Sequence, residues 1–261
     1  MLVTLIGCAT SPTGRTQFIL ISPDAAIIES ETAYLDTVRQ LEDDDKLVND
    51  PLSVARVARI TGRLVSIAIA DYPESADWKW SVAIVDDAKT VNAWCMAGGR
   101  MAVYTGLFDQ LELTDDEFAQ IMGHEISHAL ANHTAEQMSR AMATAAGVVV
   151  IGAASDNSGT AMTGAALIAN VALTLPNSRD AENEADIMGM VLATKAGYDP
   201  EAAVTLWQKM GDLNHDRPAE FLSTHPAPEN RQAALNAMIP HMLKINPSRD
   251  KAPIHPVTIV R

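Results

Sequence analysis

The chain has 261 residues, of which 48% are hydrophobic and 5% aromatic, and its formal net charge is −14. This length suffices for one sizeable core, alone or with an added arm, and the low aromatic content favours packed helices over a β-sandwich. The acidic balance argues against nucleic acid as a partner, and two cysteines are too few for a disulfide framework or a cysteine zinc site.

The first eight residues resemble part of a bacterial lipoprotein signal. The apolar run from Leu2 to Gly7 is too short to span a bilayer and lacks the basic region of a full signal sequence. However, residues 5–8 (LIGC) resemble a lipobox, in which the cysteine is lipidated, and a polar, turn-rich stretch follows. We therefore expect a lipid anchor on Cys8 in the bacterial periplasm, and Ala9 favours the outer membrane. The alternative is a buried first strand with an incidental cysteine.

The first half of the chain predicts a tether, two helices and a few strands. Residues 9–28 are expected to form a tether with one short apolar segment. Apolar residues recur at helical spacing in 29–48 and again in 51–70, which predicts two helices. Residues 78–87 alternate and are β-prone, and residues 90–107 predict two short strands broken at a pair of glycines.

From Thr114 onward the chain predicts almost only helix. Thr114 and Glu117 form a capping box, which predicts a helix that carries residues 118–136. The elements expected after it are helices over 179–196, 199–213 and 227–243 and a loose, proline-containing arm over 245–261. Residues 29–244 are therefore predicted to form one domain of the α+β class, mainly α-helical.

Residues 138–176 are two apolar stretches rich in alanine and glycine, split by the polar turn SDNSG. Each stretch is too short for a transmembrane helix, so we expect a helical hairpin that is buried by packing. A hairpin that lies over a cleft or touches the membrane surface is the alternative.

The segment His124-Glu125-Ile126-Ser127-His128 predicts a metal site. In a helix, residues four apart share a face, so both imidazoles can reach one zinc ion. Glu125 lies beside them and can take a proton from a water molecule that the ion activates. The alternative is a pair of histidines that only hydrogen-bond within the core.

The third ligand is expected on another helix, because a catalytic zinc site usually has three protein ligands. In a continuous helix His133 points to the other side, so we expect it at the surface or behind a ligand. Downstream, Glu182 and Asp186 are spaced i, i+4 and share a face, whereas Glu184 faces away. Glu182 can bind the metal while Asp186 accepts a hydrogen bond from a ligand histidine. An ordinary acidic helix start is the alternative.

The two motifs together resemble the gluzincin metallopeptidases of the HtpX and CAAX-prenyl-protease family, and are most similar to its soluble, periplasmic lipoprotein branch. Supporting stretches are CATSPTGRTQFILIS, NAWCMAGGRMAVYTGLF and STHPAPENR. The resemblance implies a gluzincin-type fold with one zinc ion per chain, held by His124, His128 and Glu182. Ala97 departs from the family, which commonly has proline before the paired glycines, and alanine there is expected to loosen the turn.

The resemblance also implies roles for other residues. The strand expected to lie at the sheet edge and pair with extended substrate consists of Arg100, Met101, Ala102 and Val103. His225 is expected near the zinc, either in the open position of a resting state or as a group that stabilises the oxyanion. A capping histidine before the last helix is the alternative. Arg179 and Arg231 are expected to pair with site carboxylates.

Four remaining residues have a simpler interpretation. Cys95 is expected to be a small buried side chain rather than a nucleophile. His215, His241 and His255 lack partners at a suitable spacing, and we expect them at the surface.

These features predict a lipid-anchored zinc metalloendopeptidase with Glu125 as general base, which cleaves misfolded envelope proteins. Its expected partners are unfolded or extended polypeptides and envelope assembly proteins. One alternative is a chaperone-like assembly factor with a latent zinc site plugged by His225. Another is a zinc hydrolase that acts on a non-peptide amide.

Overall fold

The computed structural model describes residues 8–154, 176–213, 220–226 and 230–261, and for residues 145–154 it describes the backbone alone. In chain order the elements are β1 (Cys8–Thr10), β2 (Thr16–Phe18), α1 (Pro23–Asp43), α2 (Pro51–Asp71), a 3₁₀ helix (Pro73–Asp77), β3 (Ser81–Val85), β4 (Ala93–Met96), β5 (Arg100–Tyr104), α3 (Gly106–Leu111), α4 (Asp115–Leu130), α5 (His133–Ala154), α7 (Arg179–Lys195), α8 (Ala202–Asp212), α9 (Glu220–Thr224), α10 (Arg231–Ile245) and β6 (Thr258–Val260). The predicted class, mainly helical with a small sheet, is confirmed.

The main sheet has the strand order β4-β5-β3-β6. β3 pairs in parallel with β5 and with β6, whereas β4 and β5 form the antiparallel pair predicted around the two glycines. Gly98 and Gly99 have positive φ angles of 82° and 77°, which glycine adopts readily in such a turn. The prediction that Arg100–Val103 form the edge strand is wrong, because β5 lies between β4 and β3. The edge strand on this side is β4.

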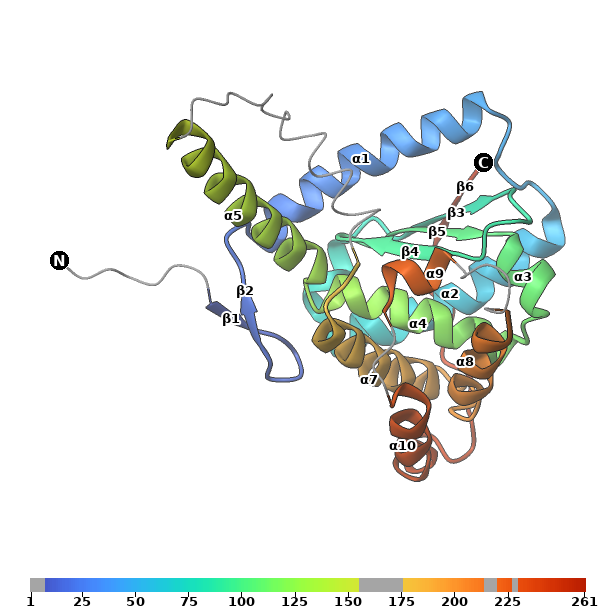
Figure 1. Cartoon of the computed structure of the whole chain (residues 1–261). Helices are drawn as coiled ribbons and strands as arrows, with labels where there is room; N and C mark the ends of the chain where they lie inside the picture. The colour runs from blue at the N-terminus through green and yellow to red at the C-terminus, as the bar shows by residue number, and fades with distance from the viewer. Residues whose placement is uncertain (1–7, 155–175, 214–219, 227–229) are drawn as a thin grey trace.

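The two faces of the sheet are covered by different helices. Side chains alternate along β3, so that Val82 and Ile84 join the core on one face, with residues of α2 and α4, and Ala83 and Val85 join the other, with residues of α1. Figure 1 shows α1 crossing one face and α2 and α4 lying on the other. On β4, Ala93 and Cys95 belong to the α4 side, which orients the edge strand toward the HExxH helix.

Helix α4 begins as predicted, but it ends earlier. Thr114 and Glu117 form the capping box, with the Thr114 side chain accepting from the Glu117 backbone N–H. The predicted continuous helix over 118–136 is wrong, because α4 stops at Leu130 and Asn132 has a positive φ of 56°. Asparagine tolerates this left-handed conformation better than most residues. The chain then turns and α5 begins at His133.

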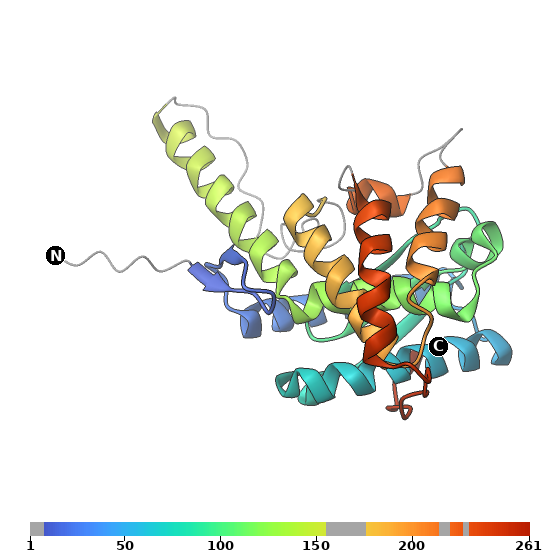
Figure 2. The same cartoon turned by 90° about the horizontal axis from the view of Figure 1, so that it is seen from below.

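Helices α4 and α7 approach each other at two glycines. A Cβ atom at Gly123 would lie 2.8 Å from the carbonyl oxygen of Gly189, and one at Gly189 would lie 2.6 Å from the backbone nitrogen of His124. Side chains of any size would separate the helices, so glycine permits this contact. α10 in turn runs alongside α7 (Figure 2). The glycine contact brings the carboxylates of α7 against the histidines of α4.

Both ends of the described chain are more ordered than the sequence predicts. The expected tether over 9–28 contains the β1–β2 hairpin, and α1 already begins at Pro23, with Ser22 accepting a hydrogen bond from the Ala25 backbone. The expected loose arm over 245–261 contains β6, which pairs with β3. These two predictions are therefore wrong, because strands of three residues are too short to show periodicity and β6 in addition pairs with a strand that is distant in the sequence.

The expected buried hairpin over 138–176 is described only in part. Residues 155–175 lie outside the described residues, and the first stretch continues α5 without interruption. Within that helix Met142 is 46% exposed, and its neighbours from Arg140 to Thr144 are exposed or half-buried. In Figure 1 this helix extends away from the body of the molecule. Among the described residues, no helix is long and apolar enough to cross a membrane.

Candidate metal centre

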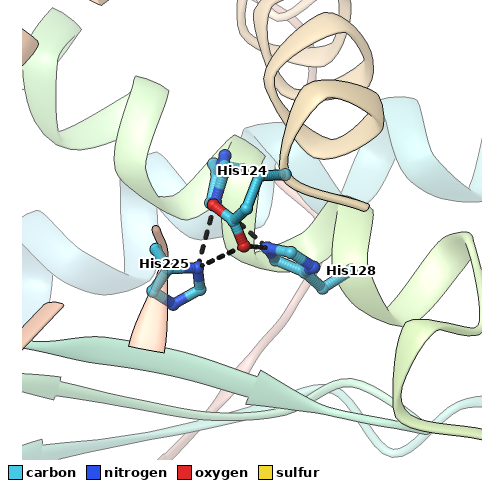
Figure 3. A group of neighbouring side chains, drawn as sticks. His124, His128 and His225 are labelled. Carbon is cyan, nitrogen blue, oxygen red and sulfur yellow. Dashed lines mark hydrogen bonds and ion pairs between the residues drawn. The ribbon is translucent and has the colours of Figure 1, made fainter. Parts of the chain in front are cut away.

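Four buried side chains bring potential metal ligands to one point. They are His124 and His128 from α4, Glu182 from the first turn of α7, and His225, which follows α9; one ligand atom from each lies within 4.8 Å of all the others. Figure 3 shows the rings of the three histidines converging on a carboxylate. The structure therefore brings together the three predicted ligands, and it adds His225 to the same cluster.

The spacing of these atoms fits a zinc ion. His124 Nε2 lies 3.0 Å from His128 Nε2 and 3.3 Å from His225 Nδ1. Carboxylate oxygens of Glu182 lie 3.4 Å from each of the first two nitrogens and 3.1 Å from the third. Ligands held roughly 2.0–2.1 Å from a tetrahedral zinc lie about 3.3 Å from one another. The nitrogen and oxygen donors present are also those that zinc prefers.

The electrostatics of the cluster favour a positive charge at the same point. Burial lowers the pKa of His124, but its hydrogen bonds to Asp186 and Glu182 outweigh this and raise it to about 10. Burial would raise the pKa of Glu182, yet the neighbouring histidines His225 and His124 hold it well below its usual range. By contrast, burial lowers the pKa of His128 well below its usual value. The carboxylates thus stabilise one cation among the rings, which is what a metal ion would supply.

Glu125 lies beside this cluster at a cavity. Its side chain is buried, its Oε1 atom makes no hydrogen bond to any described residue, and His225 Nε2 is 3.5 Å away. Burial raises the pKa of Glu125 above its usual value. The cavity is lined by Glu125, His128 and His225 and by residues 92–95, which include the start of β4. A carboxylate that is poor in partners therefore faces a space next to the sheet edge.

The chain matches the sequence model of a known protein family. The model described as Peptidase family M48 matches residues 51–239, which include strands β3, β4 and β5 and helices α4 and α7. The chain belongs to this family. M48 metallopeptidases are zinc-dependent, in agreement with the donor set of the cluster.

Curated relatives of this M48 chain come from several lineages. It is 37% identical over 158 residues to the mitochondrial metalloendopeptidase OMA1 of Arabidopsis thaliana, covering 60% of this chain and 31% of the relative. It is 28% identical over 254 residues to OMA1 of Saccharomyces cerevisiae, covering 90% and 70%. It is 30% identical over 205 residues to the beta-barrel assembly-enhancing protease of Escherichia coli, covering 75% and 41%. The chain thus spans less than half the length of the Arabidopsis and Escherichia relatives.

In the M48 chain, His124 is supported directly by residues of the helical core. Its Nδ1 atom lies 3.0 Å from the Asp186 carboxylate, the contact predicted from the i, i+4 spacing with Glu182. Arg231 binds Asp186 at 2.6 Å and Glu182 at 2.7 Å, and its guanidinium stacks over Trp207. The structure therefore places Arg231 against the site carboxylates.

His128 is supported by His133, which helical geometry excludes as the third ligand. Its Nδ1 atom lies 2.8 Å from Nδ1 of His133, whose Nε2 atom lies 3.0 Å from the Glu184 carboxylate. His133 and Glu184 are both buried. Of the two positions expected for His133, at the surface or behind a ligand, the structure shows the second, because the turn at Asn132 starts a new helix and directs the side chain toward His128. A helix-breaking asparagine just before a histidine is the sequence signal that identifies it.

His225 is held by contacts on several sides. Its ring stacks on Phe221, with centroids 4.3 Å apart, and its backbone nitrogen bonds the Phe221 carbonyl. The Asn177 backbone nitrogen bonds the carbonyl of Thr224, which ties the segment before α7 to the segment that carries His225. These contacts place the His225 ring in the cluster.

The remaining candidates differ in their surroundings, and the pairing of Arg179 with a site carboxylate stays a prediction. Arg179 is exposed at the first residue of α7, and Arg100 binds Glu31 of α1. Cys95 is buried, as predicted, and burial raises the pKa of its thiol well above the usual value. His241 is exposed as expected and His255 is half-buried, while His215 lies outside the described residues.

Proposed function

We propose that this chain is a zinc-dependent metalloendopeptidase. The observation that carries the proposal is the four-atom cluster, next to which the buried carboxylate of Glu125 faces a cavity along an edge strand. His124, His128 and Glu182 are the ligands that hold the ion. When bound, zinc supplies Lewis acidity, polarising a peptide carbonyl and making a water molecule more acidic.

Glu125 acts as the general base in this proposal. Its carboxylate takes a proton from the attacking water and passes it to the leaving amine. The raised pKa of Glu125 suits this role, since a carboxylate that is buried binds a proton more readily than one in water. Asp186 and His133 hold the two ligand rings in place, so that their Nε2 atoms face the same point.

The substrate is proposed to be an extended polypeptide that adds to the edge of β4. β5 pairs with one edge of β4, and no other described strand pairs with it. Residues 92–95 line the cavity that also contains Glu125. A peptide hydrogen-bonded along this edge would pass in front of the carboxylate. β4 thus takes the role that the sequence analysis gave to residues 100–103.

His225 supports a second candidate state, in which the chain is latent or acts as an assembly factor. Its Nδ1 atom belongs to the same cluster as the three proposed ligands, so it occupies the position that a catalytic site leaves open. In an active state the ring would leave this position and face the substrate oxyanion. The two states differ in one testable respect, which is whether removal of the ring increases cleavage.

We further propose a bacterial periplasmic location with a lipid on Cys8, and misfolded envelope proteins as substrates. The lipobox-like residues 5–8 and the exposure of Cys8 support the anchor. The relatives from Escherichia coli and Vibrio cholerae, named for β-barrel assembly, support an envelope role with assembly proteins as partners. These similarities also favour the periplasmic lipoprotein branch.

The test compares zinc-loaded wild type, Glu125→Gln and His225→Ala on casein and on an unfolded outer-membrane protein. We expect wild type to cleave both and Glu125→Gln to lose about 10²–10⁴-fold in rate, the usual contribution of a general base. Glu42→Gln, at the exposed end of α1, is the matched control and should cleave like wild type. Equal cleavage by wild type and Glu125→Gln would exclude the peptidase assignment. Cleavage by His225→Ala alone would establish the latent state.

A further inference from the structure

The N-terminal hairpin, Cys8–Phe18, is connected to the metal centre by a continuous series of polar contacts. Arg15 Nε donates to the Glu184 carboxylate at 2.9 Å, and the Thr13 hydroxyl donates to the same group. Glu184 accepts from His133 at 3.0 Å, and His133 lies 2.8 Å from His128. Two side chains, Glu184 and His133, thus link Arg15 of the hairpin to a proposed zinc ligand, and each contacts the next.

The tautomers of the two histidines determine which group donates in each contact of this series. A histidine that binds zinc through Nε2 carries its proton on Nδ1. His128 then donates that proton to Nδ1 of His133, and His133 carries its own proton on Nε2 and donates it to Glu184. A carboxylate accepts only, so Glu184 sets the tautomer of both rings. The lone pair of His128 Nε2 is left pointing into the cluster.

The hairpin also binds the turn between α4 and α5, which directs His133 toward His128. The buried Gln17 side chain donates to the carbonyl of Ala131 at 2.7 Å, at the junction between α4 and α5. Arg15 binds Glu136 in the first turn of α5 through two nitrogens, at 3.2 and 2.7 Å. In Figure 1 the hairpin lies beside the base of α5. It therefore holds both the turn before His133 and the carboxylate behind it.

Arg15 is the group that makes this contact favourable. Glu184 and Glu136 are 2% and 4% exposed, and each would be costly to bury without a cation. Arg15 forms ion pairs with both, and its hydrogen bonds to them outweigh the effect of burial and raise its own pKa. Arg140 also binds Glu136, but it makes no contact with Glu184. Arg15 is thus the cation that joins the hairpin to the His128 side of the site.

We propose that the hairpin is a positioning element of the metal centre, in which Arg15 acts through Glu184 and His133 to orient His128. The inference rests on the proposed zinc site, and it extends that site to a segment that directly follows the proposed lipid anchor. Zinc is then held at full affinity only while the hairpin is docked on α5 and α7.

The experiment measures zinc affinity of the full chain by competition with a chromophoric chelator. Loss of a residue that orients a metal ligand costs about 10–100-fold in affinity. Arg15→Ala and His133→Asn are expected to weaken binding at least about tenfold, and Arg15→Lys should restore part of the loss. Arg140→Ala, which breaks an ion pair to the same Glu136, is the matched control and should stay within about twofold of wild type. If Arg15→Ala also stays within twofold, the inference is overturned.

Two further readouts separate positioning from simple stabilisation. The visible spectrum of the cobalt-loaded chain reports ligand geometry, and it should change in Arg15→Ala but not in Arg140→Ala. The double variant Arg15→Ala/His133→Asn should bind no more weakly than His133→Asn, because both substitutions interrupt one series of contacts. A lower melting temperature with unchanged spectrum and affinity, or fully additive losses, would overturn the inference. None of these readouts requires cleavage, so a failure of the peptidase assignment would be seen separately.

Discussion

The two histidines of α4 each have a polar group close to Nδ1, and different parts of the molecule supply it. Behind His124 stands Asp186, which is bound by Arg231, and all three residues are buried between helices. Behind His128 the contacts pass through His133 to Glu184 and end at the hairpin. The contacts behind His124 thus lie within the helical core, whereas those behind His128 extend to the N-terminal hairpin, which binds α5 and α7 through Arg15.

The largest difference should appear in folding stability. Arg231→Ala leaves two buried carboxylates without their cation, and breaking a buried ion pair in this way costs about 3–5 kcal/mol. Arg15→Ala should cost only about 1–2 kcal/mol, because Arg140 still pairs with Glu136 and His133 still contacts Glu184. Urea unfolding of the chelator-treated chain measures both free energies. Arg231→Lys, which keeps the charge, should fall between wild type and Arg231→Ala. Equal costs for the two alanine variants would contradict the comparison.

A smaller effect should come from disturbing the glycine contact between α4 and α7, which positions the carboxylates behind both histidines. Gly189→Ala places a Cβ against the backbone of α4 and should cost about 1–3 kcal/mol, as overpacked cores do. Because α7 carries both Asp186 and Glu184, zinc affinity should fall as well. In Gly211→Ala a Cβ would meet no atom within 4 Å, so that variant should match wild type or gain about 0.5–1 kcal/mol. Identical unfolding curves for the two variants would show that the helices can separate freely.

The smallest expected effect is a loss of stability of the hairpin contacts at low pH. Burial would raise the pKa of Glu136, but its hydrogen bonds to Arg15 and Arg140 outweigh this and lower it below 4.5. A depressed pKa in the folded chain means that the stabilisation is complete above about pH 4.5 and is lost as pH falls through the folded value. Hydrogen exchange of the hairpin amides should therefore accelerate below about pH 4.5, by an opening energy of about 1 kcal/mol or less.

Glu136→Gln removes that pH dependence, since glutamine does not titrate. Its hairpin amides should exchange faster than those of wild type at neutral pH and change less on acidification. Glu42→Gln, far from the hairpin, should keep the wild-type profile. A Glu136→Gln profile that runs parallel to wild type would show that this carboxylate does not hold the hairpin.

Much of the site follows from local patterns, and the rest depends on contacts that no local pattern contains. The capping box and the i, i+4 pairs place His124, His128 and Glu182 on helix faces, because helical geometry alone determines such placement. The position of His133 depends on a single left-handed residue, Asn132. The periodicity of the segment predicts a continuous helix and does not indicate this turn.

The order of strands in the sheet also depends on contacts that no local sequence pattern contains. The glycine pair predicts a hairpin of β4 and β5, but which of the two lies at the edge depends on β3, and β3 is reached only through tertiary pairing. The short strands β1, β2 and β6 carry no periodicity of their own over three residues each. Sequence patterns therefore locate the residues of the metal cluster better than they locate the edge strand proposed to receive the substrate.

The glycine contact between α4 and α7 has a consequence for how the metal is bound. Gly123 and Gly189 meet through backbone atoms, so no side-chain rotamer can change to alter the distance between the two helices. The backbone positions that carry the proposed donors on α4 and α7 are consequently set when the chain folds, so this part of the ordering entropy is not lost on binding an ion. Adjustment around a bound ion is then left to side-chain rotation and to His225, the one member of the cluster outside these two helices.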